Sequence, residues 1–211
     1  MGHAGTLDPM ATGLMIIGVG EGTKKLQDFL KLDKIYEAEI LLGIRTDTGD
    51  VTGKILKELG SMNYELSEEE IKKTLEEMVG KLELPVPAYS AVKRGGEPLY
   101  RKARRGEVFE SPIKTMEVID CKLLAIRHPR DILCHSHENG NSDITALDSL
   151  FQGNDKQGVV VKARFTVASG TYIRSLAEEF GRRLGIPATL AGLRRTKIGD
   201  FRVENAEELT S

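Results

Sequence analysis

Apolar and polar residues along the chain are spaced in two ways, one typical of strands and one typical of helices. Short apolar runs and strict alternation between apolar and polar positions indicate β-strands. After residue 35, for example, Tyr36, Ala38 and Ile40 would fall on one side of an extended chain. The segments with a strand pattern are 13–20, 36–50, 115–128, 159–170 and 193–209, of which the second and the last include polar turns.

Three segments have apolar residues at the spacing of an amphipathic helix. The clearest is 67–80, which starts with a capping box formed by Ser67 and Glu70. The other two are 22–34 and 171–185. Because strands and helices follow one another without a repeated strand–helix–strand unit, the pattern predicts an α+β fold.

Composition narrows the class of protein. Apolar residues make up 40% and charged residues 29% of the 211 positions, so we expect a folded core rather than disorder. The longest apolar run, 14–19, is far too short to span a bilayer, and no basic segment before it marks a signal peptide. The two cysteines, Cys121 and Cys134, form no disulfide framework and are typical of a reducing compartment. We therefore predict a cytoplasmic protein without a membrane anchor.

Charge is concentrated in two stretches, although the net charge is only −2. Residues 65–77 contain six acidic and two basic side chains, whereas residues 93–105 contain six basic side chains and one acidic. A basic stretch with an interleaved aromatic residue, here Tyr100, is a candidate surface for a polyanion. A solvated surface loop would have the same composition, so charge alone leaves both interpretations open.

Three other motifs do not establish a function. Residues 18–24, GVGEGTK, lack the glycine that a dinucleotide-binding loop needs at Thr23, and they lack the Gly-Lys-Ser/Thr order of a phosphate loop. The cluster of Cys134, His135 and His137 has no second set of ligands at a familiar spacing, so we expect no metal site. The first residues match a myristoylation pattern, but they have a better explanation below.

A glycine-rich stretch at the start of the chain, GHAGTLDPMATG, places Asp8 before a proline. Such an aspartate by itself indicates no more than an Asx turn. Several longer stretches, however, resemble in order the motifs of the TruB-type tRNA pseudouridine-55 synthases, and the resemblance covers nearly the whole chain outside about 128–158. They are GHAGTLDPMATGLMIIGVGEGTKKL (2–26), DKIYEAEILLGIRTDTGDVTGKI (33–55), PVPAYSAVKRGGEPLYRKARRGEVFE (85–110), and SGTYIRSLAEEFGRRLG (169–185) followed by LRRTKIGDF (193–201).

The resemblance implies one catalytic domain over residues 1–211 with the pseudouridine-synthase fold, in which a mixed, largely antiparallel sheet is flanked by helices and loops. It implies a thumb-like segment at about 87–110 that grips RNA, and it leaves 128–158 as a polar insertion that we expect to be mobile. The implied activity converts uridine to pseudouridine in the T loop of tRNA, without a metal or an organic cofactor. The implied partner is the T-arm stem-loop of tRNA, and we expect a monomer without an obligate protein partner.

The resemblance also implies three catalytic residues. Asp8 matches the catalytic aspartate, whose carboxylate acts as a nucleophile or as a base, and the sequence leaves these two roles open. Arg174 matches the arginine that pairs with this aspartate, and a carboxylate in a closed pocket needs such a partner. Tyr36 matches the tyrosine that stacks on the target base and is placed for proton transfer at C5, although its strand pattern alone would indicate a core residue.

Further residues are implied to contact the RNA. The target base lies inside a folded loop, so the enzyme must flip it out at a cost of about a few kcal/mol. Contacts with the phosphate backbone, to which basic residues contribute, can offset that cost. The residues assigned to RNA binding are His3, Tyr172, Leu193, Lys93, Arg94, Arg101, Arg104, Arg105, Arg194 and Arg195.

Two differences from the family leave alternatives open. Family members have further residues before the Gly-His motif, including a strand of the central sheet, and bacterial members add a C-terminal RNA-binding domain. Here Met1 directly precedes Gly2, so we expect either a start assigned to an internal methionine or a sheet that lacks this strand. The alternatives to an enzyme are therefore an RNA-binding or tRNA-folding module impaired in catalysis, and a fragment that does not fold alone.

Overall fold

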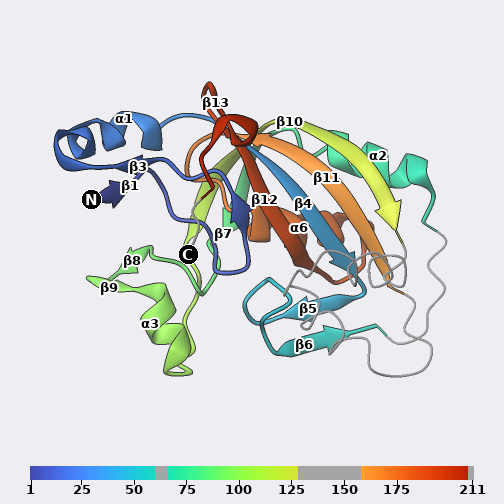
Figure 1. The fold of residues 1–211 in the computed structure, drawn as a ribbon. Helices are drawn as coiled ribbons and strands as arrows, with labels where there is room; N and C mark the ends of the chain where they lie inside the picture. The colour runs from blue at the N-terminus through green and yellow to red at the C-terminus, as the bar shows by residue number, and fades with distance from the viewer. Residues whose placement is uncertain (60–65, 128–157, 209–211) are drawn as a thin grey trace.

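The computed structural model describes residues 1–59, 66–127 and 158–208, so the insertion predicted at 128–158 lies almost entirely outside the described residues (Figure 1). The strands are β1 (Gly2–His3), β2 (Thr12–Gly13), β3 (Ile17–Gly18), β4 (Lys34–Leu42), β5 (Ile44–Thr46), β6 (Ile55–Glu58), β7 (Gly80–Pro85), β8 (Lys93–Arg94), β9 (Glu97–Pro98), β10 (Ile113–Arg127), β11 (Val159–Val167), β12 (Ala188–Ile198) and β13 (Phe201–Arg202). The helical segments are η1 (Gly20–Lys25), α1 (Leu26–Leu30), α2 (Glu68–Glu76), α3 (Leu99–Arg104), α6 (Ile173–Leu184) and η2 (Val203–Asn205).

The long strands form the predicted mixed, largely antiparallel sheet. Its strand order is β13–β12–β4–β11–β10–β7, and each neighbouring pair in that order is antiparallel. The short strand β2 adds a parallel pairing with β12, through Thr12 and Gly13. Because β4 lies between β12 and β11, Tyr36 on β4 has Arg195 on one side and Phe165 on the other.

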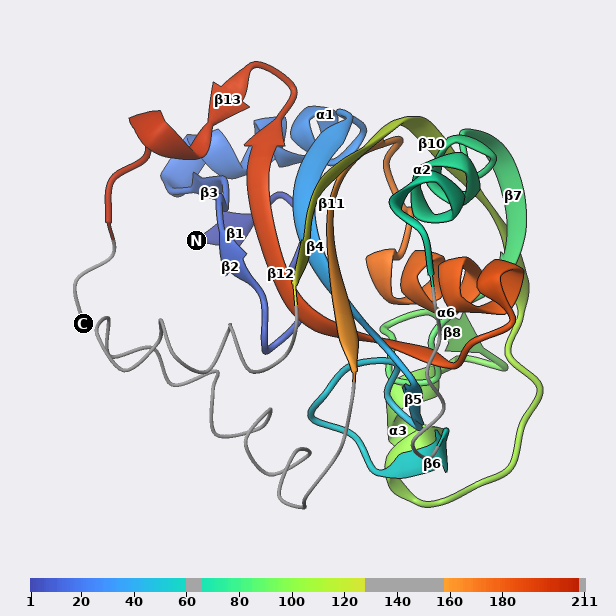
Figure 2. The ribbon, with the colours of Figure 1, turned by 90° about the vertical axis from the view of Figure 1, so that its right-hand side faces the viewer.

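Helices α2 and α6 cover one face of this sheet, as Figure 2 shows. The apolar side chains of α6 recur three or four residues apart, so Ile173, Leu176 and Phe180 all face the core. Gly181 allows α6 to approach the sheet closely, because a Cβ atom there would lie 2.4 Å from the Cβ of Ala188 on β12. The helix that carries Arg174 is therefore packed tightly against the strand that pairs with the N-terminal segment.

The ends of α2 and α6 follow the signals in the sequence. Ser67 accepts a hydrogen bond from the backbone N–H of Glu70, and the Glu70 carboxylate accepts one from the backbone N–H of Ser67, which confirms the predicted capping box. Helix α6 ends at Gly185, whose φ of 71° is in the left-handed region that favours glycine. These boundaries depend only on neighbouring residues, and the sequence predicts them well.

The N-terminal part of the chain differs from the prediction. The sequence predicts a buried strand at 13–20, but only β2 and β3 form there, and Val19 is 67% exposed. The helix predicted at 22–34 is reduced to η1 and the short α1. Gly13 has a φ of 101° and Gly20 a φ of 56°, so the backbone turns where a strand would continue.

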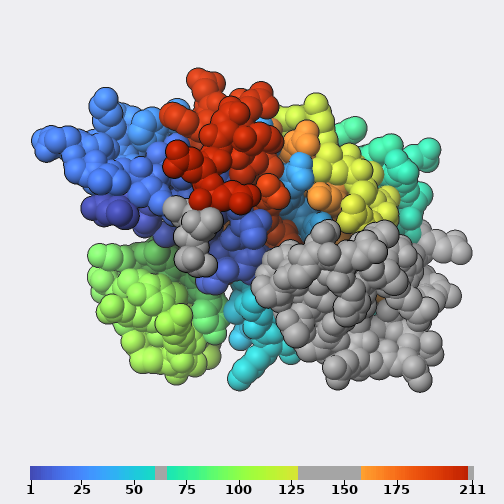
Figure 3. Space-filling view, viewed as in Figure 1, coloured from blue at the N-terminus to red at the C-terminus, as the bar shows by residue number. Residues whose placement is uncertain are grey.

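Residues 87–110, here called the thumb, form a lobe beside the sheet. The lobe contains the β8–β9 hairpin and α3, and Leu99 anchors it in the main core with no exposed surface. Figure 3 shows the thumb in green, next to the cyan β5–β6 hairpin and below the blue N-terminal segment. Three segments that are far apart in the sequence therefore meet at one end of the molecule.

Candidate active site

Asp8 lies between β1 and β2, in a segment that includes β2 and is here called the catalytic loop (residues 4–14). The backbone N–H of Ala11 donates to the carbonyl of Asp8 at 2.9 Å, which closes a turn around the proline. At the end of the loop, Leu14 N–H donates to the carbonyl of Arg195 at 2.8 Å. Gly13 is required there, because a Cβ atom would lie 2.3 Å from that same carbonyl oxygen. The loop is therefore fixed to β12 and presents Asp8 at the edge of the sheet.

Arg174, the second residue of α6, holds the Asp8 carboxylate from across the molecule. Its Nε donates to Oδ2 of Asp8 at 2.9 Å, and its Nη2 donates to Oδ1 at 2.8 Å, over a sequence separation of 166 residues. The Arg174 side chain is 5% exposed and that of Asp8 is 29% exposed. A two-point contact of this kind fixes the orientation of the carboxylate while leaving part of it accessible to a ligand.

The remaining donors of Arg174 join two further segments to the pair. Nη1 donates to the carbonyl of Thr48 at 2.9 Å, and Nη2 donates to the carbonyl of Tyr89 in the thumb at 3.1 Å. Nη1 also lies 3.8 Å from Oδ2 of Asp50, which is 6% exposed. One guanidinium therefore connects the catalytic loop, the turn after β5 and the start of the thumb.

Tyr36 is buried on the face of the sheet that carries Arg195. Burial raises the pKa of the Tyr36 phenol above its usual value of 10.0, and the charge of Arg195 and a hydrogen bond with it oppose that shift. The negative charge of Asp8 raises the pKa of Tyr36 further, so the two side chains are near enough to interact. The phenol is therefore protonated at neutral pH and lies within electrostatic range of Asp8.

Tyr172 immediately precedes α6 and is half-buried beside the same pair. Burial raises the pKa of its phenol, the charge of Arg174 opposes the shift, and the charge of Asp8 adds to it. The ammonium group of Lys114 lies 5.6 Å from the centre of the Tyr172 ring. The structure therefore brings Asp8, Tyr36, Tyr172 and Arg174 to one site.

Arg195 has a role that the sequence did not reveal. We predicted an RNA contact, but the side chain is 1% exposed and its Nε donates to the carbonyl of Leu14 at 2.7 Å. Its Nη2 and Nη1 reach the carbonyls of Gly5 and Thr6 at 3.2 and 3.5 Å. Arg195 therefore supports the catalytic loop from inside instead of facing solvent. The exposed neighbour, Arg194, alternates to the opposite side of β12.

The other residues predicted to bind RNA divide into exposed and internally engaged side chains. In the thumb, Arg105 donates to both oxygens of Glu97 at 2.6 and 2.9 Å and to Glu107 at 2.6 Å, and these contacts raise its pKa. Arg94 donates to the carbonyl of Glu110. Leu193 is buried in the main core. The remaining exposed residues of the set are His3, Lys93, Arg101, Arg104 and Arg194.

A cavity of about 350 Å³ lies beside the Asp8–Arg174 pair. Its walls come from the catalytic loop, the turn after β5 and the thumb. In that turn, Oδ1 of Asp50 accepts hydrogen bonds from the hydroxyls of Thr48 and Thr52 at 2.8 and 2.5 Å. We did not predict a role for these residues, although the polar run RTDTGDVTG could have indicated one.

Metal ligands and membrane spans are both absent from the part of the chain that the structure describes. Within residues 1–59, 66–127 and 158–208, no group of three or more His, Cys, Asp or Glu side chains could hold a metal ion. No helix in the same ranges is long and apolar enough to cross a membrane. Cys134, His135 and His137 lie outside the described residues.

Comparison with known sequences gives matches over most of the chain. Residues 1–173 match the family described as TruB family pseudouridylate synthase (N terminal domain). The tRNA pseudouridine synthase B of Xanthomonas campestris pv. campestris (strain 8004) is 40% identical over 201 residues, which cover 95% of this chain and 55% of that protein. The protein of the same name from Aromatoleum aromaticum is 36% identical over 210 residues, covering 100% and 58%. The chain therefore spans little more than half the length of these relatives.

Comparison with solved structures shows the same fold. A chain in the crystal structure of a Cbf5–Nop10–Gar1 complex gives a TM-score of 0.60 at 25% identity, covering 95% of this chain and 41% of that one. A structure of an H/ACA RNP bound to a substrate RNA containing 2'-deoxyuridine gives a TM-score of 0.56 at 22% identity, which is a likeness of fold alone. Taken with the family match over residues 1–173, the predicted motifs and fold are confirmed, and the chain belongs to the TruB family of pseudouridylate synthases.

Proposed function

We propose that this chain converts uridine to pseudouridine in the T loop of tRNA, with Asp8 as the catalytic carboxylate. The reaction breaks the bond between N1 of the base and C1′ of the ribose, turns the base, and forms a bond from C5 to C1′. The C5 proton is then lost and N1 gains one, so the product is an isomer of the substrate. No metal or organic cofactor is needed to balance these steps.

The observation that carries this proposal is the two-point contact between Arg174 and Asp8. The guanidinium fixes both oxygens of the carboxylate, at 2.9 and 2.8 Å. It also supplies the positive charge that a carboxylate needs when a bound base excludes water from it. Part of Asp8 is still exposed, so the carboxylate can reach a ribose or base carbon of a bound nucleotide. A nucleophilic role and a basic role both fit this arrangement.

Tyr36 is the second catalytic residue of the proposal. It stacks on the target base and takes part in the proton transfer at C5. Its raised pKa supports this role, because the phenol is neutral at physiological pH and can donate or accept a hydrogen bond beside Asp8. Tyr172 and Leu193 complete the wall around the base.

Binding of the RNA is assigned to the exposed basic side chains. Flipping the base costs about a few kcal/mol, and charge-assisted contacts with phosphates offset that cost. The basic residues of the thumb and Arg194 would supply these contacts, and His3 would touch the opened loop. We further propose that the chain acts in the cytoplasm as a monomer with tRNA as its partner.

The test is release of tritium from a tRNA transcript labelled at uridine C5. We expect release by the chain, and a rate at least about 100-fold lower for Asp8→Asn, which keeps the shape of the side chain but removes its basicity. Asp120→Asn is the matched control, because Asp120 lies on β10 and its side chain is 51% exposed. Circular dichroism and an RNA-binding assay on each variant exclude a loss of folding or affinity as the cause.

A second candidate function gives a different result. If the folded chain binds the transcript but releases no tritium, it is an RNA-binding or tRNA-folding module. If Asp8→Asn releases tritium as fast as the unmodified chain, Asp8 is not the catalytic carboxylate.

A further inference from the structure

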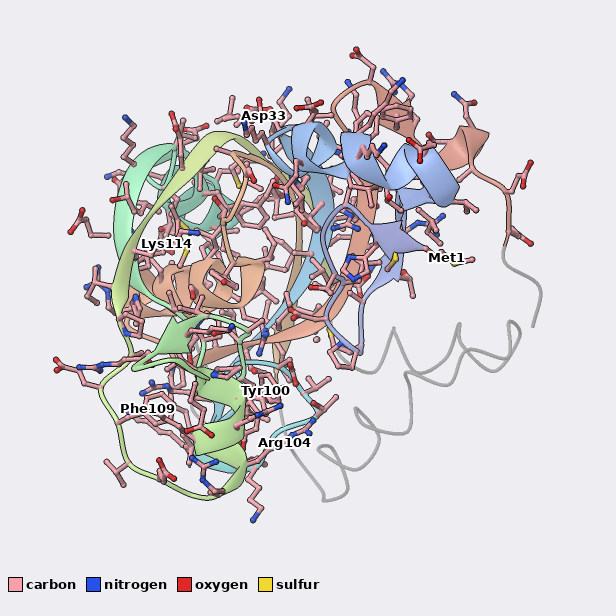
Figure 4. The ribbon with its side chains drawn as sticks, turned by 90° about the vertical axis from the view of Figure 1, so that its left-hand side faces the viewer. Met1, Asp33, Tyr100, Arg104, Phe109 and Lys114 are labelled. Carbon is pink, nitrogen blue, oxygen red and sulfur yellow. The ribbon has the colours of Figure 1, made fainter. Side chains whose placement is uncertain are left out.

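Lys114 lies near the start of β10, in a row of side chains that otherwise packs into the core. Side chains alternate along a strand, so Lys114, Met116 and Val118 point to the same face of the sheet. Met116 and Val118 are each 1% exposed in the main core, whereas Lys114 is exposed. Figure 4 shows Lys114 on β10, next to helix α6. Lys114 therefore continues a core-facing row beyond the edge of the core, beside the start of α6.

Residues 168–172, here called the pre-helix turn, lead from β11 to α6 and end with Tyr172. At the start of the turn, the backbone N–H of Ala168 donates to the carbonyl of Glu117 on β10 at 3.0 Å. At its end, the acceptor for the N–H of Tyr172 is the sulfur of Met116 at 3.5 Å. A thioether sulfur is a weak acceptor, so the backbone holds the end of the turn less firmly than its start.

The ammonium group of Lys114 adds two contacts at the tip and end of this turn. It donates to the carbonyl of Gly170 at 2.9 Å and lies 5.6 Å from the centre of the Tyr172 ring. A Cβ atom at Gly170 would lie 2.5 Å from the ammonium nitrogen, so glycine leaves room for this approach. An ammonium is a compact charge with three donors, and it can therefore bind a carbonyl and an aromatic face together. One side chain thus holds both the turn and the ring that follows it.

The Tyr172 ring has few other contacts that could fix its orientation. Within residues 1–59, 66–127 and 158–208, its hydroxyl has no hydrogen-bond partner. The ring is half-buried against the main core, within electrostatic range of Asp8 and Arg174. The direction in which it faces Asp8 therefore depends on core packing and on Lys114.

We propose that Lys114 is a positioning residue for the isomerisation of uridine, which rests on the function proposed above. It fixes the Tyr172 ring beside Asp8 in the free protein, so that this wall of the base site is formed before the target uridine enters. Pre-organisation of this kind acts on the rate within the complex, because the contacts with the rest of the RNA stay the same. Lys114 itself touches no reacting atom.

The first test measures the single-turnover rate of tritium release at saturating protein, together with the dissociation constant of the same T-arm stem-loop. Lys114→Met should lower the rate by about 3- to 10-fold and change the dissociation constant less than about twofold, because a cation–π contact and a hydrogen bond that orient the ring are lost. Lys114→Arg should keep most of the rate, since a guanidinium can make both contacts. Lys122→Met is the matched control on β10, because the Lys122 side chain is 67% exposed and pairs with Asp120.

Two changes at Tyr172 identify the group on which Lys114 acts. Tyr172→Phe keeps the ring, so adding Lys114→Met should lower the rate by the same factor as in the unmodified chain. Tyr172→Leu removes the ring, so adding Lys114→Met should have little further effect. An equal loss in all three backgrounds would overturn the proposal, because Lys114 would then act on another group.

Nuclear magnetic resonance of the free protein tests the geometry without RNA. The ring current of an aromatic side chain shifts protons above its face upfield. The ε-CH₂ signal of Lys114 should therefore move downfield in Tyr172→Leu and stay in place in Tyr172→Phe, with Lys122 as the reference. An unchanged signal in Tyr172→Leu would show that the ring and the ammonium group are not in contact, and it would overturn the proposal.

The remaining outcomes separate the positioning role from an RNA contact and from the proposed function. If Lys114→Met reduces the slope of log affinity against log salt concentration by about 0.7 to 0.9 and leaves the saturated rate unchanged, Lys114 contacts a phosphate and the positioning role is wrong. If the unmodified chain releases tritium and Lys114→Met releases it as fast, the positioning role is wrong and the function stands. If the unmodified chain releases none, the function is wrong and the positioning role is rejected with it.

Discussion

Three arginines among the described residues each contact both oxygens of one carboxylate, and two of them, Arg174 and Arg105, lie in very different surroundings. Arg174 holds Asp8 at 2.9 and 2.8 Å, with side chains that are 5% and 29% exposed. Arg105 holds Glu97 at 2.6 and 2.9 Å within the thumb, with side chains that are 49% and 31% exposed. The chemistry and the distances are similar, so the difference between the pairs comes from what surrounds them.

Around Arg174, every donor that points inward has a backbone or carboxylate partner from a different segment. Removing the guanidinium would take a hydrogen-bond donor from the carbonyls of Thr48 and Tyr89. It would also take the positive partner from the carboxylates of Asp8 and Asp50. Around Arg105 the partners are all within the thumb, and water can replace each of them. Burial and partners from distant segments, rather than the ion pair itself, therefore give the Arg174–Asp8 pair its structural role.

The largest effect is expected from Arg174→Met, which keeps an unbranched side chain but removes the guanidinium and its charge. We expect the free energy of unfolding to fall by about 3–5 kcal/mol, because the buried Asp50 and the part-buried Asp8 both lose the guanidinium that compensates their charge. Chemical denaturation followed by circular dichroism measures this change. A fall below about 1 kcal/mol, the range of surface pairs, would show that the two pairs are energetically alike.

An intermediate effect is expected from pH, with opposite signs in the two regions. The pKa of Tyr36 is raised in the folded state, so its contribution to stability is present below pH 10 and is lost as the pH rises toward the folded value. The pKa of Glu97 is lowered by the hydrogen bonds from Arg105, so its contribution is lost in acid. Tyr36→Phe should therefore lose less stability than the unmodified chain between about pH 9 and 11. Parallel alkaline unfolding curves for the two proteins would contradict this.

The smallest effect is expected from Arg105→Gln. Its contacts with Glu97 and Glu107 are exposed to solvent, and we expect the midpoint of chemical unfolding to stay unchanged. The same denaturation experiment on Arg174→Met provides the comparison. A shift as large as that of Arg174→Met would show that the thumb depends on this pair.

Local structure could be predicted where the interactions are local. The capping box at Ser67, the stop at Gly185 and the alternation of β4 all depend on residues a few positions apart, and the structure confirms them. The segment 13–20 has the same kind of pattern but differs in the structure, because Gly13 and Gly20 have positive φ and turn the chain there. The segment 22–34 is helical as far as Leu30, within η1 and the short α1.

The sequence by itself determined the α+β class, the principal strands and helices, the family, and the candidates Asp8, Tyr36 and Arg174. Only the tertiary structure decided which arginine of the pair 194–195 faces inward and that the buried hydroxyl of Ser90 has no hydrogen-bond partner among the described residues. The physical reason is separation along the chain. Asp8 and Arg174 are 166 residues apart, and their contact forms only after α6 packs on the sheet and β2 pairs with β12. Signals within one turn or strand are present in the sequence, whereas the environment of a side chain exists only once distant elements have packed together.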